Sequence, residues 1–127
     1  MKKALVLTWE KFQDHEVIYP FYALKQEGFE VDVAANAYGR VPGILGAFIV
    51  CDKLVEDLDP NNLDEYDLLV IPGGVKALEK LRLEPKAVEF AKNWVNAGKI
   101  TFVVCNGTQL LITADVLKGR TCSGYYS

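Results

Sequence analysis

The sequence predicts a doubly wound α/β domain, with a mostly parallel sheet and helices on both faces. Two observations lead to this prediction. Short apolar runs alternate with helical patterns along the chain, and the runs at 68–71 and 100–104 are apolar almost without interruption. Strands that are buried on both faces of a helix-covered parallel sheet have this pattern. The chain has 127 residues, which is enough for a single domain spanning 1–127.

The N-terminal elements can be placed from their own signals. Residues 4–8 form the first expected strand, and a weaker alternating run at 31–35 forms the second. Between them, residues 16–27 repeat apolar side chains at helical spacing. Asp14 is the expected N-cap of this helix, and Pro20 is expected to kink the helix or to delay its start.

The remaining elements follow from turns and helical spacing. Glycines and a proline in 37–59 indicate turns, and residues 48–51 form a short expected strand in a hairpin. A second clear helix is expected over 85–97, where Pro85 suits the first turn. A third helix should begin near Gly107. In a sheet of this order, binding sites lie at the C-terminal ends of the strands.

Composition excludes several classes of function. The net charge is −3 and the basic residues form no separate face, so nucleic acid is not an expected partner. No apolar run reaches the roughly 20 residues of a membrane helix, and the N-terminal apolar run is too short for a signal peptide. The three cysteines are far apart in the sequence, so neither a disulfide framework nor a zinc site is indicated. We therefore expect a cytoplasmic protein without a metal.

Nucleotide cofactors are not expected either. The chain contains neither a G-x-G-x-x-G segment after its first strand nor a G-x-x-x-x-G-K-[ST] segment. Both of these glycine-rich patterns hold phosphate groups with backbone N–H groups at the start of a helix. We therefore predict no cofactor.

The most informative segment for chemistry runs from Val103 to Gly107. An apolar strand leads directly into Cys105, then a glycine, then an expected helix. This is the arrangement of a nucleophile elbow, although the usual glycine before the nucleophile is absent. A thiol at a helix N-terminus is stabilised as the reactive thiolate. The alternative is a small buried cysteine at the end of a strand.

Two other segments end at the same predicted edge of the sheet. Gly73 and Gly74 follow the strand at 68–71, and their small size allows backbone amides to approach a ligand or an oxyanion. The alternative is a tight turn between a strand and a helix. His15, the single histidine, should begin a helix and face solvent, so it is a poor candidate for a catalytic base.

Taken together, these segments resemble the PfpI branch of the ThiJ/PfpI superfamily, which includes intracellular proteases and deglycases. The resemblance extends over essentially the whole chain, and its motifs are specific in combination. They are Phe12-x-Asp14-x-Glu16, Tyr19-Pro20, Leu69-Val70-Ile71-Pro72-Gly73-Gly74, Cys105-x-Gly107-x-Gln109-Leu110-Leu111 and Val116-Leu117-Lys118-Gly119-Arg120. The resemblance implies a flavodoxin-like fold and a cysteine-dependent site.

The resemblance also assigns roles to residues. Cys105 would be the nucleophile, and Gln13 matches the position of an acid that hydrogen-bonds the sulfur in relatives. The Gly74 and Asn106 amides would be oxyanion donors, with Gly73 and Gly107 allowing close backbone approach. Glu79 is the nearest match to an acid that can be supplied across a subunit interface.

Two site positions depart from the family pattern. Gln13 keeps a hydrogen-bond donor but cannot carry a proton near neutral pH. Asn106 stands where the peptidase branch has histidine, which removes the usual Cys-His pair. On this reasoning Gln13→Glu should restore a proton carrier. The leading hypothesis is an enzyme acting on a small carbonyl compound or a peptide.

A rival hypothesis from another class is a non-catalytic member that acts as a redox sensor, a chaperone or a binding scaffold. The retained elbow favours the enzyme, whereas Gln13 and Asn106 favour the rival. Relatives continue through further strands and a last helix, and we expect no counterpart of these elements before Ser127. A truncated inactive fragment is therefore a third hypothesis. An uncovered apolar face would favour a homo-oligomer, a dimer or larger.

Overall fold

The computed structural model describes residues 2–103 and Leu110. Its main sheet has five strands in the order β5-β2-β1-β6-β7, and every pair of neighbours is parallel. The strands are β1 (Lys3–Leu7), β2 (Glu30–Ala35), β5 (Lys53–Leu54), β6 (Leu68–Ile71) and β7 (Ile100–Val103). The parallel sheet predicted from continuous apolar runs is confirmed.

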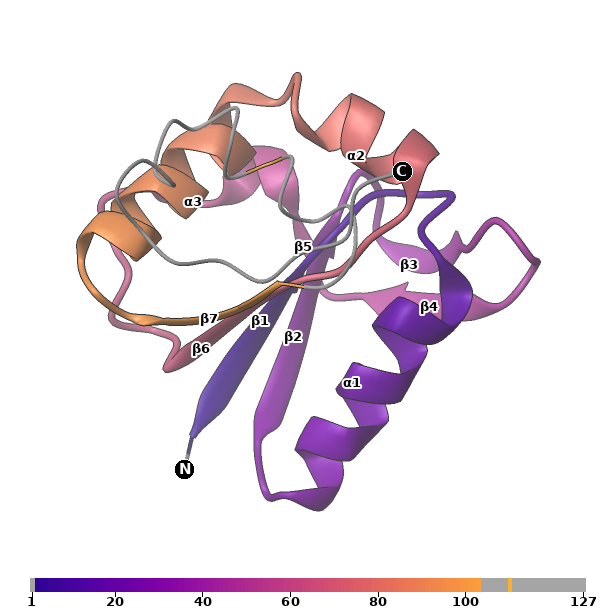
Figure 1. Cartoon of the computed structure of the whole chain (residues 1–127), viewed down its shortest axis with the longest axis horizontal. Coiled ribbons are helices and arrows are strands. Elements are labelled where there is room, and N and C mark those ends of the chain that lie inside the picture. The colour runs from indigo at the N-terminus through magenta and orange to yellow at the C-terminus, as the bar shows by residue number, and fades with distance from the viewer. Residues whose placement is uncertain (1, 104–109, 111–127) are drawn as a thin grey trace.

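Helices cover both faces of this sheet. Helix α1 (Asp14–Gln26) connects β1 to β2 and lies on one side, whereas α3 (Pro85–Asn96) lies on the other (Figure 1). Two shorter elements, the 3-10 turn η1 (Val55–Asp57) and helix α2 (Val75–Leu81), were not expected from the sequence. The doubly wound arrangement is confirmed. The third expected helix falls outside the described residues except for Leu110, which is buried.

The core is formed by the central strands and the apolar side of α3. Residues 4–7 of β1 are completely buried, as are Trp94 and Leu78. Trp94 stacks on Phe90 with 5.9 Å between ring centroids, and its Nε1 donates a hydrogen bond to the Ile100 carbonyl at 3.0 Å. That bond ties α3 to the start of β7. Complete burial of an apolar side chain such as that of Leu78 contributes about 1.5–3 kcal/mol to the stability of the fold.

The start of α1 differs from the prediction. The N-cap position is Gln13, whose side chain makes no capping bond, and Asp14 is the first residue of the helix. The helix also runs through Pro20 and does not start late. The reason is that the Asp14 carboxylate has other partners, which anchor the first turn.

These partners belong to the predicted hairpin, formed by β3 (Gly39–Pro42) and β4 (Phe48–Cys51) in antiparallel pairing. In the loop between them, the Leu45 N–H donates to Asp14 Oδ1 at 2.8 Å, and the Ala47 N–H donates to Oδ2 at 2.7 Å. Gly43 leaves room for the carboxylate, since a Cβ there would lie 2.4 Å from Oδ1. One buried acid thus joins the hairpin to α1.

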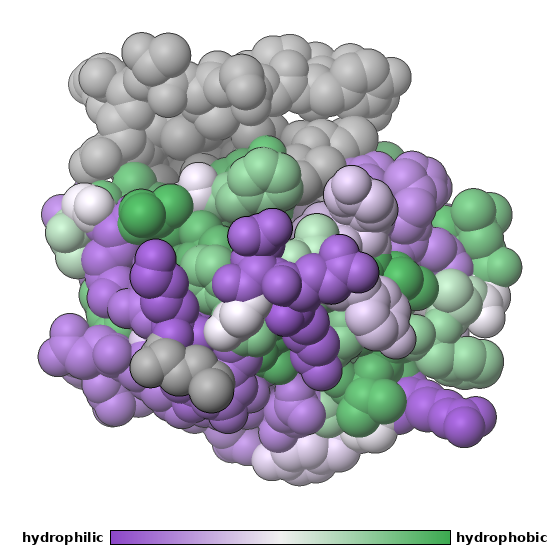
Figure 2. Space-filling model, turned by 90° about the horizontal axis from the view of Figure 1, so that it is seen from below, coloured by the Kyte–Doolittle hydropathy of each residue, from purple (hydrophilic) through white to green (hydrophobic). Residues whose placement is uncertain are grey.

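Apolar side chains also reach the surface. The face in Figure 2 mixes hydrophilic and hydrophobic residues. A groove of about 320 Å³ between α1 and strands β6 and β7 is lined mainly by apolar side chains. Ile100 and Phe102, on β7, are 70% and 51% exposed. The expected homo-oligomer remains a prediction. No helix in the described part of the chain is long and apolar enough to cross a membrane.

The Asp14 bonds predict a specific loss of stability. Asp14→Ala should lower the free energy of unfolding by about 2–4 kcal/mol, because two backbone N–H groups lose a charged acceptor. Chemical denaturation would measure the change. Asp64→Ala, at an exposed acid, is the matched control and should change the stability by less than about 0.5 kcal/mol. Equal effects of the two substitutions would show that Asp14 does not anchor the hairpin.

Candidate active site

Two neighbouring strands end side by side at the C-terminal edge of the sheet. Strands β1 and β6 pair in parallel, with Val6 opposite Val70. Beyond their ends, the Gln13 N–H donates to the Gly73 carbonyl at 3.3 Å. The structure therefore brings together Gln13, Gly73 and Gly74, three of the residues that the sequence predicted for the site.

Gly74 is the tightest point of this arrangement. It is buried, with φ at +123°, and an ideal Cβ would lie 2.8 Å from the Gln13 nitrogen and 3.0 Å from the Phe12 Cα. Only glycine fits this position without displacing the backbone of the loop after β1. Among the described residues, the Gly73 and Gly74 N–H groups have no hydrogen-bond acceptor. Backbone N–H groups of this kind can stabilise a developing oxyanion, and that role remains a prediction here.

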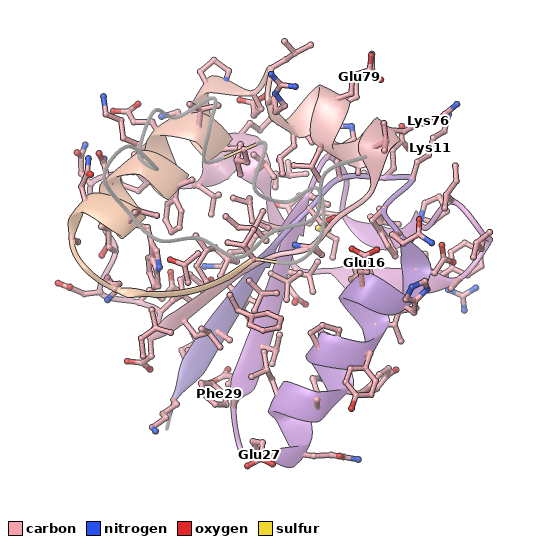
Figure 3. All side chains as sticks on the ribbon, in the orientation of Figure 1. Lys11, Glu16, Glu27, Phe29, Lys76 and Glu79 are labelled. Carbon is pink, nitrogen blue, oxygen red and sulfur yellow. The ribbon has the colours of Figure 1, made fainter. Side chains whose placement is uncertain are left out.

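Glu16 is a candidate that the sequence analysis missed. It lies in the first turn of α1, near the C-terminal edge of the sheet, and its N–H donates to the Gln13 carbonyl at 3.0 Å (Figure 3). Its Oε1 is buried and has no hydrogen-bond partner within the described residues. A buried carboxylate oxygen without a partner is costly and calls for an explanation. The signal was present in the Phe12-x-Asp14-x-Glu16 pattern, which was quoted without a role for its last residue.

The Thr8 hydroxyl, at the same edge of the sheet, is also buried without a hydrogen-bond partner among the described residues. Thr8 follows β1 directly and is completely buried, and its Oγ1 also has no partner within the described part of the chain. Its N–H donates to the Ala34 carbonyl at 2.9 Å, which fixes the end of β1 against β2. Thr8 and Glu16 are the two described residues with such an unpaired buried side-chain oxygen.

The expected nucleophile lies just outside the described residues. Strand β7 ends at Val103, which pairs with Ile71 at the end of β6. Cys105 follows two positions later, and Asn106 and Gly107 come next. The roles of these three residues therefore remain predictions.

Two further acid–base candidates are exposed. His15 points to solvent at the start of α1, as the sequence predicted. Glu79 lies exposed on α2 and contributes to a small cavity discussed below. Its suggested role across a subunit interface remains a prediction.

Cys51 offers a comparison for Cys105, the predicted nucleophile. It is 3% exposed, and its Sγ donates to the carbonyls of Lys53 at 2.8 Å and Val33 at 3.3 Å. Burial raises the pKa of the Cys51 thiol, which keeps it protonated at neutral pH. Cys51 is therefore a structural cysteine.

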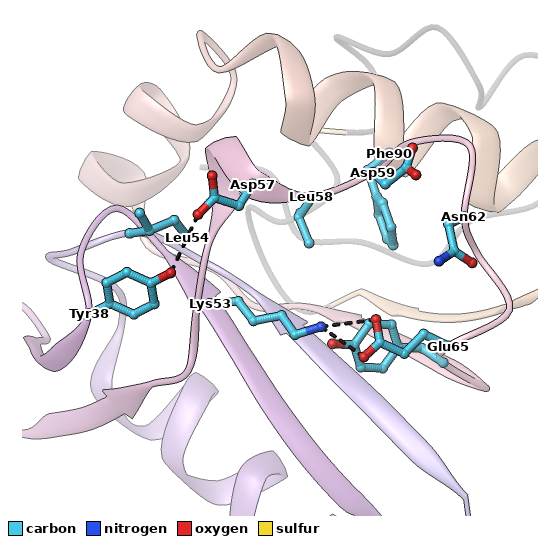
Figure 4. A pocket seen from close by; sticks show the side chains of 10 residues that line it. Tyr38, Lys53, Leu54, Asp57, Leu58, Asp59, Asn62, Glu65 and Phe90 are labelled. Atoms are coloured by element: carbon cyan, nitrogen blue, oxygen red, sulfur yellow. Dashed lines mark hydrogen bonds and ion pairs between the residues drawn. The ribbon is translucent and has the colours of Figure 1, made fainter.

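A separate cavity of about 290 Å³ lies between the loop that contains η1 and helix α3 (Figure 4). Its charged groups are largely paired with each other. Lys53 Nζ contacts both Glu65 oxygens, at 3.0 and 2.9 Å, and the Lys53 hydrogen bond lowers the pKa of Glu65. The Tyr66 hydroxyl donates to Asp32 at 2.7 Å, and burial raises its pKa. This network stabilises the fold, and none of the predicted site residues lines the cavity.

Metal ions in proteins require clusters of ligand side chains. Among residues 2–103 and 110, no group of three His, Cys, Asp or Glu side chains could hold a metal ion. The described part of the candidate site therefore consists of backbone N–H groups, the amide of Gln13 and the carboxylate of Glu16.

Comparison with known proteins identifies the family. The model of the DJ-1/PfpI family matches residues 2–127. The chain belongs to the DJ-1/PfpI family. Two curated relatives are deglycases, from Pyrococcus abyssi at 43% identity and from Pyrococcus furiosus at 42%. Each alignment covers 97% of this chain and 72% of the relative.

A solved structure confirms the fold of this DJ-1/PfpI domain. A two-domain protein of Anabaena variabilis, with DJ-1/ThiJ/PfpI-like and ferritin-like domains, superimposes with a TM-score of 0.88 at 34% identity. The match covers 98% of this chain and 35% of the Anabaena protein. The flavodoxin-like fold implied by the sequence resemblance is therefore correct. Family membership and the deglycase relatives support a deglycase-like or hydrolase-like function.

The close approach at Gly74 predicts an unequal pair of glycine variants. Gly74→Ala should lower the free energy of unfolding by about 3 kcal/mol or more, because the added methyl group meets backbone atoms in a left-handed conformation. Gly98→Ala is the matched control, since Gly98 has φ at +75° but nothing within 4 Å of an added Cβ. It should cost about 1 kcal/mol. Equal losses in thermal or chemical denaturation would contradict the proposed contact.

Proposed function

We propose that this protein is a glyoxalase- or deglycase-type enzyme that acts on small carbonyl compounds through Cys105. The observation that carries the proposal is the buried Glu16 oxygen near the strand ends, which has no hydrogen-bond partner among the described residues. The Glu16 carboxylate can accept and return a proton, which the Gln13 amide cannot do. The deglycase relatives support the same reaction class.

In the first step, the Cys105 thiolate attacks the aldehyde carbon of a 2-oxoaldehyde such as methylglyoxal. A carbon–sulfur bond forms, and the carbonyl oxygen becomes an alkoxide. The Gly74 and Asn106 N–H groups hydrogen-bond that oxygen, and protonation gives a hemithioacetal. Backbone donors aimed at a developing oxyanion are typically worth several kcal/mol of transition-state stabilisation.

The second step needs a group that both accepts and returns a proton. The Glu16 carboxylate removes the proton from the carbon attached to sulfur and delivers it to the neighbouring carbon, while the hydroxyl proton of the hemithioacetal moves to the neighbouring carbonyl oxygen. The product is a thioester of a 2-hydroxy acid. Water then cleaves the carbon–sulfur bond, which releases lactate and restores the thiol. Gln13 orients the sulfur through its amide N–H, since an amide donates a hydrogen bond but does not titrate.

The peptidase and non-catalytic readings have weaker support. Asn106 is not a general base, so the chain offers no Cys-His pair at that position. The non-catalytic reading rested on the loss of an acid at Gln13. Glu16, three residues further along, provides a carboxylate within the same loop-to-helix segment. The non-catalytic reading then becomes the outcome expected if the assay below finds no turnover.

Activity measurements on Glu16 test the proposal. The wild-type protein should convert methylglyoxal to lactate, and NMR would follow both compounds. Cys105→Ala should remove the activity. Glu16→Gln should lower kcat by about 10²–10⁴-fold, the usual worth of general acid–base catalysis. Glu16→Gln should not lower the melting temperature, because the replaced oxygen has no partner among the described residues.

Two other variants serve as controls. Glu27→Gln, at an exposed acid next to the C-terminal end of the same helix, should keep full activity (Figure 3). Gln13→Glu should change the rate less than Glu16→Gln does. If Gln13→Glu raises the rate strongly and Glu16→Gln leaves it unchanged, the proton carrier belongs at position 13 and not at Glu16. A folded wild-type protein without any turnover of methylglyoxal would refute the enzymatic proposal.

A further inference from the structure

A cavity of about 210 Å³ lies beside the candidate active site, between the loop after β1 and helix α2. Its lining residues are Trp9, Glu10, Lys11, Lys76, Glu79 and Lys80. Two of these residues are close in sequence to the residues of the candidate site. Lys11 comes two residues before Gln13, and Lys76 comes two residues after Gly74. Because the Gln13 N–H donates to the Gly73 carbonyl, the two walls are fixed relative to each other.

The charges of this cavity favour an anion. Three lysines face two glutamates, which gives a surplus of one positive charge. No ion pair joins any of these five side chains to another described residue, since the recorded ion pairs all involve Lys3 or Lys53. Lys11 comes from the loop after β1 and Lys76 from helix α2, and the two lie near each other (Figure 3). Their ammonium groups therefore retain the capacity to bind a ligand.

The backbone holds Lys11 in an unusual conformation. Lys11 is the only described non-glycine residue with a positive φ, at 67°. Such a conformation costs about 1–2 kcal/mol for a side chain of this kind. It is maintained by two bonds, from the Lys11 N–H to the Pro42 carbonyl at 2.8 Å and from the Ile44 N–H to the Phe12 carbonyl at 2.9 Å. These bonds to the hairpin therefore fix the backbone of Lys11. A fixed backbone reduces the entropy lost when the Lys11 side chain binds a ligand.

We infer that this cavity binds the anionic end of the substrate, so that the preferred substrates are carbonyl compounds carrying a carboxylate. The inference rests on the proposed function for the identity of the reacting group. Lys11 and Lys76 together bind the carboxylate, and the half-buried Trp9 contacts the carbon chain between the two ends. The aldehyde end then lies at the Gly74 side, where the chemistry occurs.

A pair of probes that differ only in charge tests the inference. The first is 4,5-dioxopentanoate, a 2-oxoaldehyde that ends in a carboxylate, and the second is its uncharged methyl ester. The wild-type protein should prefer the acid in kcat/KM. In Lys11→Met/Lys76→Met this preference should fall about 3- to 10-fold, mainly through KM, whereas turnover of the ester should not change. The preference should also decrease with added salt.

Lys92→Met is the matched control, because Lys92 is exposed on α3, away from the cavity. It removes the same charge from the protein and should leave the preference unchanged. If Lys92→Met and the double variant reduce the preference equally, the effect is one of net charge and the cavity assignment is wrong. An unchanged preference in the double variant would also overturn it.

A binding measurement separates this inference from the proposed function. Lysines of the Cys105→Ala protein would be dimethylated with ¹³C, which preserves their charge and prevents imine formation. The Lys11 and Lys76 signals should shift on titration with 4,5-dioxopentanoate and not with the ester. If these shifts occur while the wild-type protein turns over neither probe, the enzymatic proposal is refuted and the anion site stands. Signals that do not move would overturn the anion site, whatever the activity.

Discussion

The contact between Gly74 and the backbone of Phe12 and Gln13 determines the geometry of the candidate site. It brings the turn after β6 to within van der Waals distance of the loop after β1 and permits the hydrogen bond from Gln13 to Gly73. A side chain at position 74 would separate the two loops. The Gly73 and Gly74 N–H groups, the start of α1 and the lysine cavity all lie within a few residues of this contact.

A second constraint supports the first. Asp14 binds two N–H groups of the hairpin loop, and the hairpin in turn holds Lys11 and Phe12 through backbone bonds. The loop after β1 is therefore fixed on both sides, by the turn after β6 and by the hairpin. Preorganised donors of this kind favour a transition state because they need not reorganise during the reaction. The same rigidity holds Glu16 in the first turn of α1, where its buried Oε1 has no hydrogen-bond partner within residues 2–103 and 110.

Much of this fold could be predicted, because its signals are local. Continuous apolar runs identified the central strands, and Pro85 with the spacing of apolar residues identified α3. The family motifs then predicted that Gln13, Gly73 and Gly74 would belong to one site. The role of Asp14 could not be predicted in this way, since its partners at Leu45 and Ala47 are more than thirty residues away. A carboxylate before a helix is typical of an N-cap, and only tertiary structure shows the alternative.

Glu16 and α2 illustrate two other limits. The acid of the site was sought at position 13, where family likeness placed it, and the glutamine there suggested a lost function. Burial of Glu16 Oε1 is a three-dimensional property that no spacing rule reveals. Helix α2 has only seven residues, which is too short for a clear periodic pattern. It nevertheless forms one wall of the lysine cavity.

The proposed reaction requires that Cys105 be an activated thiol, and the rate of its alkylation by iodoacetamide tests this most directly. Peptide mapping would give separate rates for Cys105 and Cys51 in the folded and the denatured protein. Folding should accelerate Cys105, because a site that stabilises the thiolate raises its reactivity at neutral pH. Folding should slow Cys51 strongly, because it is 3% exposed and burial raises its pKa. If folding slowed both cysteines alike, Cys105 would be an ordinary buried cysteine and the proposed active site would be wrong.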